Sequence, residues 1–401
     1  MVDITKIVTA KYIFDGVKLH ENSVVLLNND TIIDIVHNVY DVVCGTKMVY
    51  DMKMLQSKVS QFKFHHDQVI NYGNGVICPG FIDLQLNGCG GVLFNENISV
   101  HTLEIMFQTC CKYGTTSFLP TLITCGFSDV ILALETVKEW FGKYGNSRGV
   151  IGIHLEGPFI SKIKRGIHAE EFIIKPTNDL LRRIVGYIKY FPIKMTIAVE
   201  EFTVEQLHFL VSNGVILAIG HSNATYQQVM DSIQAGVKTV THTFNAMSGL
   251  TARNPGVIGG ALNSDALYTG VIADLLHVEI ANIQLLYKLK QANKMYLVSD
   301  AVTPSGTATV TEFILVGKKL RVIDGKCIDE TGVIGGANLM MPTAIKNCIQ
   351  NCEISLEVVL TMASLTPATV MCLDKYFGII KAGYKANLVY LDLEHYTTAL
   401  V

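Results

Sequence analysis

Short apolar runs alternate with longer amphipathic segments from about residue 80 to residue 304. Short apolar strands that alternate with helices are typical of a parallel sheet covered on both faces. Eight repeats predict that this sheet closes into a (β/α)₈ barrel of the TIM type, in the α/β class. An open, doubly wound sheet is the alternative, but no G-x-G-x-x-G follows the first run. The predicted strands lie at 80–87, 116–122, 150–156, 194–200, 215–221, 239–245, 269–275 and 294–300.

Both ends of the chain have the pattern of short strands separated by turns. Examples are the runs at 6–14, 23–27 and 31–36, and the tail at 378–393. We expect the two ends to join in one small β-sandwich domain. After the eighth barrel strand, the pattern predicts a hairpin insertion at 312–327 and a helical stretch at 341–368. The predicted division is 1–55 for the first part of the β domain, 56–78 for a linker or connecting strand, 79–368 for the barrel and 369–401 for the second part of the β domain.

Composition describes a compact chain, with 49% apolar residues and a formal net charge of −3. This charge gives no electrostatic reason to expect a nucleic acid or an anionic membrane as partner, although a local basic pocket for an anionic small molecule remains open. Ten scattered cysteines without a C-x-x-C pair indicate reduced thiols and argue against both disulfides and a structural zinc site. With no signal-peptide pattern and no apolar stretch long enough for a membrane span, we expect a cytoplasmic protein.

Polar residues gather where the predicted strands end, and a barrel of this type carries its chemistry at those ends. The residues concerned are Gln85 and Asn87 (first strand), Glu156 (third), His221 (fifth), His242 (sixth), Asp274 and His277 (seventh) and Asp300 (eighth). Each residue alone could have a purely structural role, such as a helix N-cap for Glu156 or part of a turn for His221. Burying several unpaired ionisable groups costs several kcal/mol each, so the set as a whole favours a shared cation.

The residue types indicate metal-assisted hydrolysis of an amide. Two neutral imidazoles and one carboxylate suit Zn²⁺, with a fourth position left for a water whose pKa the ion lowers to roughly 7. Asp300 is placed to take a proton from that water and to return it to a leaving group. His277 is placed to donate to a carbonyl oxygen. We expect one divalent ion, zinc first, while Fe²⁺, Co²⁺ and Mn²⁺ remain alternatives because affinity order does not decide the metal used in cells.

Several motifs resemble those of the N-acetylglucosamine-6-phosphate deacetylase family of the amidohydrolase superfamily, nearly end to end. The resemblance implies that the substrate is an N-acetylated amino sugar 6-phosphate, which is hydrolysed to acetate and the free amine. Each motif is short, but together and in this order they are specific. They are P-G-F-I-D-L-Q-L-N-G-C-G-G (79–91), L-P-T-L-I-T (119–124), H-L-E-G-P-F-I (154–160), K-R-G-I-H (164–168), G-H-S-N-A-T (220–225), T-H-T-F-N-A-M (241–247), R-N-P-G (253–256), A-D-L-L-H-V (273–278) and V-S-D-A (298–301).

The resemblance also implies roles for individual residues. The metal ligands are Glu156, His221 and His242, and the acid–base residue is Asp300. Many amidohydrolases hold a second metal with H-x-H after the first strand; Gln85 and Asn87 stand there instead, which favours a single ion. The implied substrate contacts are Ile167, His168, Asn245, Ala246, Arg253, Asp274, Leu275, Leu276, His277, Val333, Ile334 and Gly335.

Arg253 and His168 suit a phosphate group, since both offer N–H donors. The family can complete this phosphate contact across a dimer interface, so we expect a homodimer. The chain departs from the family pattern at Leu275, where glycine is common, at Thr243, where an apolar residue is usual, and at 334–337, which reads I-G-G-A and lacks hydroxyl groups.

Three other functions remain open at this point. The nearest is the same reaction on the galactosamine epimer, because residue identities do not separate epimers. Another is a different amidohydrolase without a phosphate contact, in which replacing Arg253 would barely alter KM. The third is a non-catalytic sugar-phosphate sensor, which would have no need of Asp300 beside two histidines.

Overall fold

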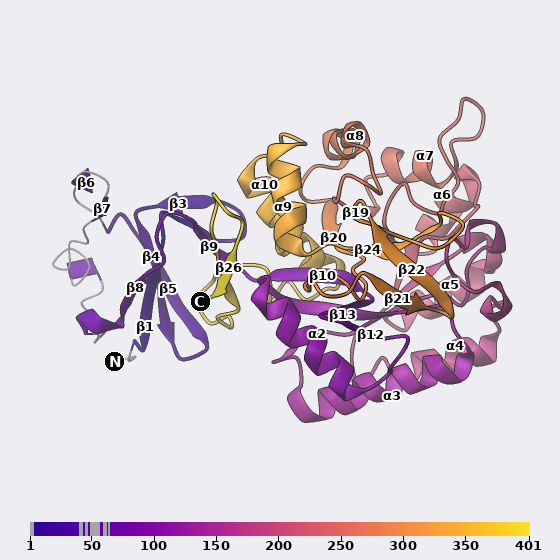
Figure 1. Ribbon diagram of the computed structural model, residues 1–401, viewed down its shortest axis with the longest axis horizontal. Coiled ribbons are helices and arrows are strands. Elements are labelled where there is room, and N and C mark those ends of the chain that lie inside the picture. The colour runs from indigo at the N-terminus through magenta and orange to yellow at the C-terminus, as the bar shows by residue number, and fades with distance from the viewer. Residues whose placement is uncertain (1–3, 40–42, 45–46, 49–56, 59–61, 63–64) are drawn as a thin grey trace.

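The computed structural model describes residues 4–39, 43–44, 47–48, 57–58, 62 and 65–401. Its larger part is a barrel of parallel strands surrounded by helices, and its smaller part is built from antiparallel and mixed sheets (Figure 1). Strands from both ends of the chain lie in the smaller part (Figure 1).

Eight parallel strands form the barrel, and each pairs with the next in sequence order. The predicted (β/α)₈ fold is therefore confirmed. Most strands are shorter than predicted, while the second is longer, at 115–123 against the predicted 116–122. The run at 239–245 contributes only two residues, because the backbone turns into the left-handed region at His242 and Phe244. The barrel strands are β10 (Phe81–Leu86), β13 (Thr115–Ile123), β15 (Ile153–Glu156), β16 (Ile193–Ile197), β17 (Ile216–Ile219), β18 (Thr239–Val240), β19 (Tyr268–Ile272) and β20 (Met295–Val298), with β14 (Gly149–Val150) paired to β13.

The seam between the first and last barrel strands is closed just beyond their ends. The amide of Asp300 donates to the carbonyl of Gln85 over 2.9 Å, and the amide of Asn87 donates to the carbonyl of Ala301 over 2.9 Å. Asp83 adds a side-chain bond from β10 to the hydroxyl of Ser299 after β20. These bonds bring the first and eighth strand ends together, where the candidate site residues lie.

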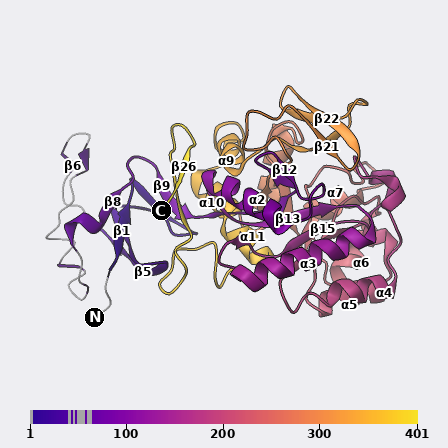
Figure 2. The same cartoon turned by 60° about the horizontal axis from the view of Figure 1, so that its bottom comes forward.

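Helices cover the outside of the barrel (Figure 2). Their buried positions recur at helical spacing, as in α3, where Val130, Ala133, Leu134 and Val137 face the core. The predicted helical stretch at 341–368 is confirmed as three helices, α9 to α11. The helices are α2 (Val100–Lys112), α3 (Phe127–Tyr144), α4 (Asn178–Val185), α5 (Val204–Ser212), α6 (Tyr226–Gln234), α7 (Gly256–Asn263), α8 (Ile280–Lys290), α9 (Met341–Gln350), α10 (Leu356–Ala363) and α11 (Leu365–Val370), with short 3₁₀ turns η1 (His66–Gln68), η2 (Lys162–Lys164), η3 (Glu170–Phe172) and η4 (Val199–Glu201).

The small β part contains two sheets that share a core. The predicted meeting of the two chain ends is confirmed, because Val389 pairs with Cys78 in the second sheet, and residues from both sheets, such as Val25 and Ile77, pack together. The first sheet is β5 (Thr31–His37), β4 (Ser23–Asn28), β1 (Lys6–Thr9) and β8 (Val69–Asn71); the second is β26 (Thr398–Leu400), β25 (Leu388–Leu391), β9 (Val76–Pro79), β2 (Tyr12–Phe14) and β3 (Leu19–Glu21); β6 (Val43–Cys44) and β7 (Lys47–Met48) pair separately.

The domain boundaries stay a prediction. Parts of the predicted segments 1–55 and 56–78 lie outside the described residues. The described portion of 56–78 supplies β8 to one sheet and most of β9 to the other, so it is more than a connection between domains.

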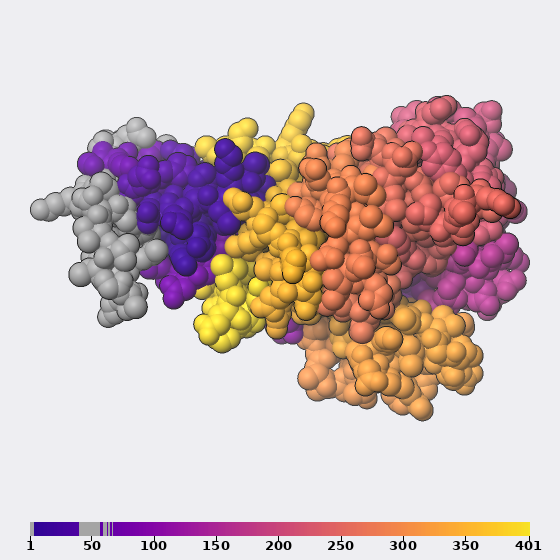
Figure 3. Space-filling model, turned by 90° about the horizontal axis from the view of Figure 1, so that it is seen from above, coloured from indigo at the N-terminus to yellow at the C-terminus, as the bar shows by residue number. Residues whose placement is uncertain are grey.

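The predicted hairpin insertion is part of a larger antiparallel sheet beside the barrel mouth. This sheet contains β21 (Glu312–Leu315), β22 (Lys318–Ile323), β23 (Lys326–Ile328) and β24 (Ile334–Ala337), and a separate small hairpin contains β11 (Gly88–Cys89) and β12 (Val92–Leu93). In the space-filling view the four-stranded sheet stands out from the barrel as an orange lobe (Figure 3). Its buried residues Phe313, Leu315 and Leu320 pack against Ile167 and Val302 of the barrel loops.

Two expectations from composition have a structural counterpart. Every helix in the described part of the chain is too short or too polar to cross a membrane. The nine cysteines with described side chains are all free, and seven of these nine are buried; Cys44 lies outside that set. The rejection of disulfides therefore holds for all cysteines that the structure describes.

The junction between the small β part and the barrel offers a test of the packing. Val389 on β25 is fully buried in the core cluster that also contains barrel residues. We predict that Val389→Ala lowers the free energy of unfolding by about 2 kcal/mol, from lost burial and a residual cavity. Leu400→Ala on β26, where the side chain is 49% exposed, is the matched control and should change stability by less than about 0.5 kcal/mol. Equal effects in chemical denaturation would contradict the packing described here.

Candidate active site

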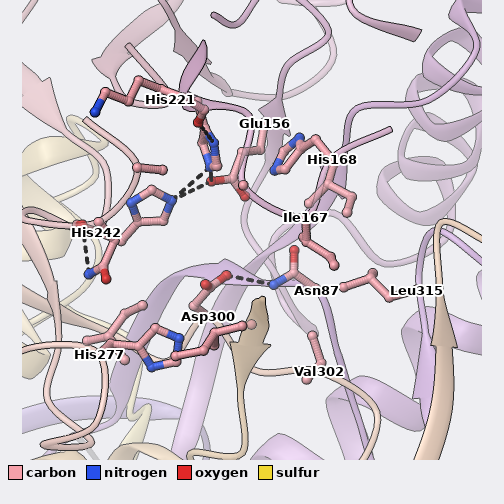
Figure 4. Close-up of a pocket in the computed structure, with 18 of the residues that line it drawn as sticks. Asn87, Glu156, Ile167, His168, His221, His242, His277, Asp300, Val302 and Leu315 are labelled. Carbon is pink, nitrogen blue, oxygen red and sulfur yellow. Dashed lines mark hydrogen bonds and ion pairs between the residues drawn. The ribbon is translucent and has the colours of Figure 1, made fainter. Parts of the chain in front are cut away.

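Three side chains from three different strand ends converge at the barrel mouth (Figure 4). Oε1 of Glu156 lies 2.9 Å from Nε2 of His242 and 3.3 Å from Nε2 of His221. The two histidine Nε2 atoms are 3.1 Å apart. All three residues are buried. The structure therefore brings together three groups that are far apart in the sequence.

Local backbone geometry aims these side chains at the cavity. Glu156 is the last residue of β15, and Gly157 directly after it has φ of 98°, in the left-handed region. A Cβ at position 157 would stand 2.1 Å from Oγ1 of Thr124, so only glycine fits there. His221 and His242 follow their strands by two residues and also adopt positive φ, of 46° and 26°. Such conformations are costly for non-glycine residues and gather at functional sites.

His221 is held in the tautomer that offers a lone pair to the cavity. Its Nδ1 lies 2.9 Å from the carbonyl of Lys164, so Nδ1 carries the proton and donates it. Nε2 is then an acceptor, and it faces an oxygen of Glu156. A second partner that orients a histidine in this way is typical of metal ligands.

The three converging atoms fit a cation. Ligand atoms in a tetrahedral site with arms of roughly 2.0–2.2 Å stand about 3.4 Å apart, close to the 2.9–3.3 Å observed here. Burial raises the pKa of Glu156 but the two imidazoles lower it further, so that it ends well below its usual value. The group is thus an ionised carboxylate and two imidazoles that face one point, and their role as metal ligands stays a prediction.

His168 is an alternative third ligand by distance alone. One of its nitrogens lies in a group with Glu156 and His221 whose ligand atoms are all within 4.8 Å of one another. Its Nδ1, however, accepts from the amide of Thr124 over 3.4 Å and lies 2.8 Å from Oγ1 of the same residue. Burial lowers the pKa of His168 well below its usual value, so the ring is neutral with its proton on Nε2. These contacts suit His168 as a hydrogen-bond donor, and His242 stays the predicted third ligand.

Asp300 lies close to this group, at the barrel seam. Its backbone is fixed on both sides, because its amide donates to Gln85 and its carbonyl accepts from the amide of Ala337. Oδ1 accepts from Nδ2 of Asn87 over 2.7 Å and from Nε2 of Gln85 over 3.0 Å. Burial raises the pKa of Asp300 to about 6, and the neighbouring carboxylate of Glu156 contributes to the rise. A carboxyl group with such a pKa can both hold and release a proton near neutrality.

Gln85 and Asn87 face the carboxylates with their N–H groups. Nε2 of Gln85 also lies 3.1 and 3.2 Å from the two oxygens of Glu156. The amide oxygens of both residues are buried without a partner. Turning either amide around would place that oxygen against a carboxylate, so the orientation is set by charge. Amide N–H groups thus bridge the acids where many amidohydrolases carry a histidine pair.

His277 reaches the cavity from the seventh strand end. Its Nδ1 lies 2.6 Å from Oδ2 of Asp274, and Oδ1 of Asp274 accepts from the amides of Leu276 and His277. Asp274 therefore positions the imidazole and leaves its Nε2 for a ligand. In Figure 4 this ring lies beside Asp300, on the opposite side of the cavity from His168.

The site residues line a cavity of about 310 Å³, which is in the range for small-molecule sites. Eleven of the predicted residues line it: Asn87, Glu156, Ile167, His168, His221, His242, Asn245, Ala246, His277, Asp300 and Ile334.

Other predicted residues are not in the cavity wall. Gln85 and Asp274 lie behind the cavity wall. Gln85 donates a hydrogen bond to Asp300, and Asp274 is hydrogen-bonded to His277. Arg253 is exposed on the surface and is not brought to the cavity within one chain. The remaining predicted contacts outside the wall are Leu275, Leu276, Val333 and Gly335.

Sequence reasoning missed much of the apolar lining. Ile123 and Ile272 end β13 and β19, so the rule of strand ends would have found them had it included apolar residues. Leu315 comes from the four-stranded sheet, and no pattern in the sequence places that sheet over the barrel mouth. The other missed lining residues are Ile163, Lys164, Gly166, Val302 and Gly336.

The departure at Leu275 has a clear structural consequence. Leu275 adopts φ of 64°, the left-handed conformation that favours glycine. The leucine side chain makes this backbone conformation costly, by about 1–2 kcal/mol. Its side chain packs against a buried cluster, which partly offsets that strain.

Comparison with known proteins places these observations in a family. The model of the amidohydrolase family matches residues 76–401. An N-acetylglucosamine-6-phosphate deacetylase from Haemophilus influenzae is 35% identical over 88% of this chain and 92% of its own length. An N-acetylgalactosamine-6-phosphate deacetylase from Shewanella is 34% identical over 80% of each chain. The crystal structure of N-acetylglucosamine-6-phosphate deacetylase from Pasteurella multocida has 34% identity and a TM-score of 0.88, with 98% of each chain covered.

The converging groups lead to a test of cation binding. We predict that Glu156→Gln and His242→Ala each lose bound divalent metal, because both remove one of three ligand atoms. Glu205→Gln removes a carboxylate from an exposed position on α5 and should keep the metal content of the parent protein. Elemental analysis of the purified variants measures this. Unchanged metal in both ligand variants would show that the ion binds elsewhere.

Proposed function

Because the chain belongs to the amidohydrolase family, we propose that it hydrolyses the N-acetyl group of N-acetyl-D-glucosamine 6-phosphate to give D-glucosamine 6-phosphate and acetate. The observation that carries the proposal is the convergence of Glu156, His221 and His242 in one cavity with Asp300. The substrate follows from relatives of that name, at 35% and 34% identity over most of the chain.

One divalent ion, Zn²⁺ in the first place, would be held by Glu156, His221 and His242. Two imidazole nitrogens and one carboxylate oxygen are the usual donor set of a catalytic zinc site. When bound, such an ion supplies a Lewis acid and makes water a stronger nucleophile at neutral pH. The amide donors of Gln85 and Asn87 occupy the carboxylate faces beside it, which supports one ion rather than two.

Asp300 transfers the proton. Its Oδ1 is engaged by two amide donors, while Oδ2 has no partner among the described residues. Oδ2 is thus the atom that accepts a proton from the attacking water. The same atom then protonates the amine nitrogen as the C–N bond breaks, which leaves acetate and the free amine. The raised pKa of Asp300, about 6, suits both steps.

The substrate is oriented by the surrounding donors. His168 presents Nε2–H next to the ligand group, so we propose His168 instead of His277 as the donor to the acyl oxygen, and His277 instead of His168 as a contact of the phosphate. His277 and Asn245 line the opposite part of the cavity and are available to sugar hydroxyls and phosphate. The exposed guanidinium of Arg253 meets a phosphate only if a second copy of the chain contributes it, and on this ground we propose a homodimer.

Deacetylation of N-acetylgalactosamine 6-phosphate is the second candidate. A relative of that name is 34% identical over 80% of this chain, and no residue of the cavity separates the two epimers. We also propose a cytoplasmic location, which nine free thiols support.

The proton transfer gives a direct prediction. Asp300→Asn should lower kcat for acetate release from N-acetylglucosamine 6-phosphate by at least about a hundredfold, because the general base is removed, while bound metal stays at the parent level. Asp231→Asn on the outer helix α6 should keep parent kinetics. Running both hexosamine phosphates in parallel decides the epimer. If the metal-loaded parent protein releases acetate from neither sugar phosphate, a non-catalytic sensor is favoured over an enzyme.

A second prediction concerns the phosphate. Arg253→Ala should raise KM for the phosphorylated sugar by about tenfold or more with a smaller change in kcat, since a charged hydrogen bond is worth roughly 1.5–3 kcal/mol. Exposed Arg182→Ala on α4 serves as the control. Sedimentation of the parent should show a dimer. If the parent is a monomer and Arg253→Ala leaves KM unchanged, Arg253 does not bind the phosphate.

A further inference from the structure

A charged residue that the proposed reaction does not use lies inside the barrel, below the candidate metal site. Lys194 on β16 is fully buried. Interiors of such barrels are usually filled by branched apolar side chains. Here the same interior contains a hydrogen-bonded chain of Thr121, His154, Thr196 and Thr241. The position of Lys194 in a polar interior calls for a physical reason.

Lys194 has little local compensation for its charge. Its Nζ has one bond, of 3.4 Å, to the carbonyl of Leu84 on β10. The side chain therefore reaches across the barrel, because β16 and β10 are separated by β13 and β15 in the sheet. No carboxylate of the described residues lies within ion-pair distance of Nζ. An isolated buried ammonium is expensive, so it is retained only where a field of opposite charge stabilises it.

The field comes from three buried carboxylates at the same end of the interior. Glu156, Asp83 and Asp300 all stabilise the charged form of Lys194, although burial lowers its pKa to about 8. Asp83 is on β10, next to the residue whose carbonyl Lys194 reaches, and it accepts from the hydroxyl and amide of Ser299 and the amide of Gln85. His154 adds no charge, because burial holds its pKa well below neutrality.

The formal charges of the buried carboxylates and of a bound divalent ion can be summed. Three carboxylates carry three negative charges, a divalent ion carries two positive charges, and one more positive charge is needed for a neutral interior. Asp274 stands apart from this set, because two backbone amides and His277 compensate it locally. We propose that Lys194 is the internal counter-ion of the metal centre, a positioning residue that balances the buried carboxylates and sets how strongly the site holds its cation.

This inference rests on the cation site of the proposed function. It predicts that removing Lys194 and removing the charge of Asp83 change the affinity for the cation in opposite directions. Removing Lys194 leaves an excess negative charge, which attracts a divalent cation more strongly. Removing the charge of Asp83 leaves an excess positive charge, which repels the cation. Removing both restores neutrality. Ordinary structural damage would weaken metal binding in every variant, so only electrostatic balance produces a gain from Lys194→Met.

The experiment measures Zn²⁺ affinity of the full-length protein, stripped of metal, by competition with a chromogenic chelator at pH 7.5. At this pH Asp83, whose pKa burial raises to about 6, is ionised. We expect Lys194→Met to bind Zn²⁺ at least about tenfold more tightly and Asp83→Asn at least about tenfold more weakly. The double variant should lie within about threefold of the parent. Lys194→Gln, which keeps a polar end group, is the second variant if Lys194→Met does not fold.

Weaker binding in both Lys194 variants, or an unchanged affinity, would overturn the counter-ion role. So would a double variant that is weaker than Asp83→Asn alone. Acetate release by the parent is assayed on the same preparation. A parent that binds no Zn²⁺ contradicts the proposed function itself, whereas an active, zinc-binding parent with the wrong sign in Lys194→Met contradicts the inference alone.

Discussion

The structure depends on the burial of three electron-pair donors that face a single point. A carboxylate oxygen and two imidazole nitrogens, from Glu156, His221 and His242, lie 2.9–3.3 Å apart inside the protein. Oε1 of Glu156 and Nε2 of His221 are both acceptors, and in a medium that screens charge poorly they repel each other unless a cation or a proton lies between them. This arrangement fits a cation, and the surrounding structure holds the three groups in place.

The barrel supplies that support through its strand ends and its seam. Parallel strands bring residues that are tens of positions apart to one edge, and the loops after them accept left-handed backbone at His221, His242 and Asp300. At the seam, backbone bonds from Asp300 and Asn87 link the first and eighth strands where the ladder itself stops. The catalytic candidate is thus part of the closure of the barrel, which couples the integrity of the fold to the geometry of the site.

Charge is balanced at several levels around this centre. The amides of Gln85 and Asn87 turn their N–H groups towards the acids, and Lys194 places an ammonium beneath them. His168 and His221, whose ring centroids are only 4.3 Å apart, have opposite tautomers because one accepts from Thr124 and the other donates to Lys164. Neighbouring groups thus decide whether an imidazole acts as a ligand or as a donor.

The sequence alone determined the alternation of strands and helices, the union of the two ends and the clustering of Glu156, His221, His242 and Asp300, since these follow from local periodicity and from the rule that parallel strands end at one edge. Tertiary structure alone decided what covers that edge. Leu315 lines the cavity because a four-stranded sheet packs over the mouth, and Arg253 lies outside it because its loop faces solvent. The tautomers and the buried charge of Lys194 were equally beyond the sequence. Periodicity reports which way a side chain points from its own strand, whereas packing between distant segments, and the field of charges that it creates, exist only once the chain has closed on itself.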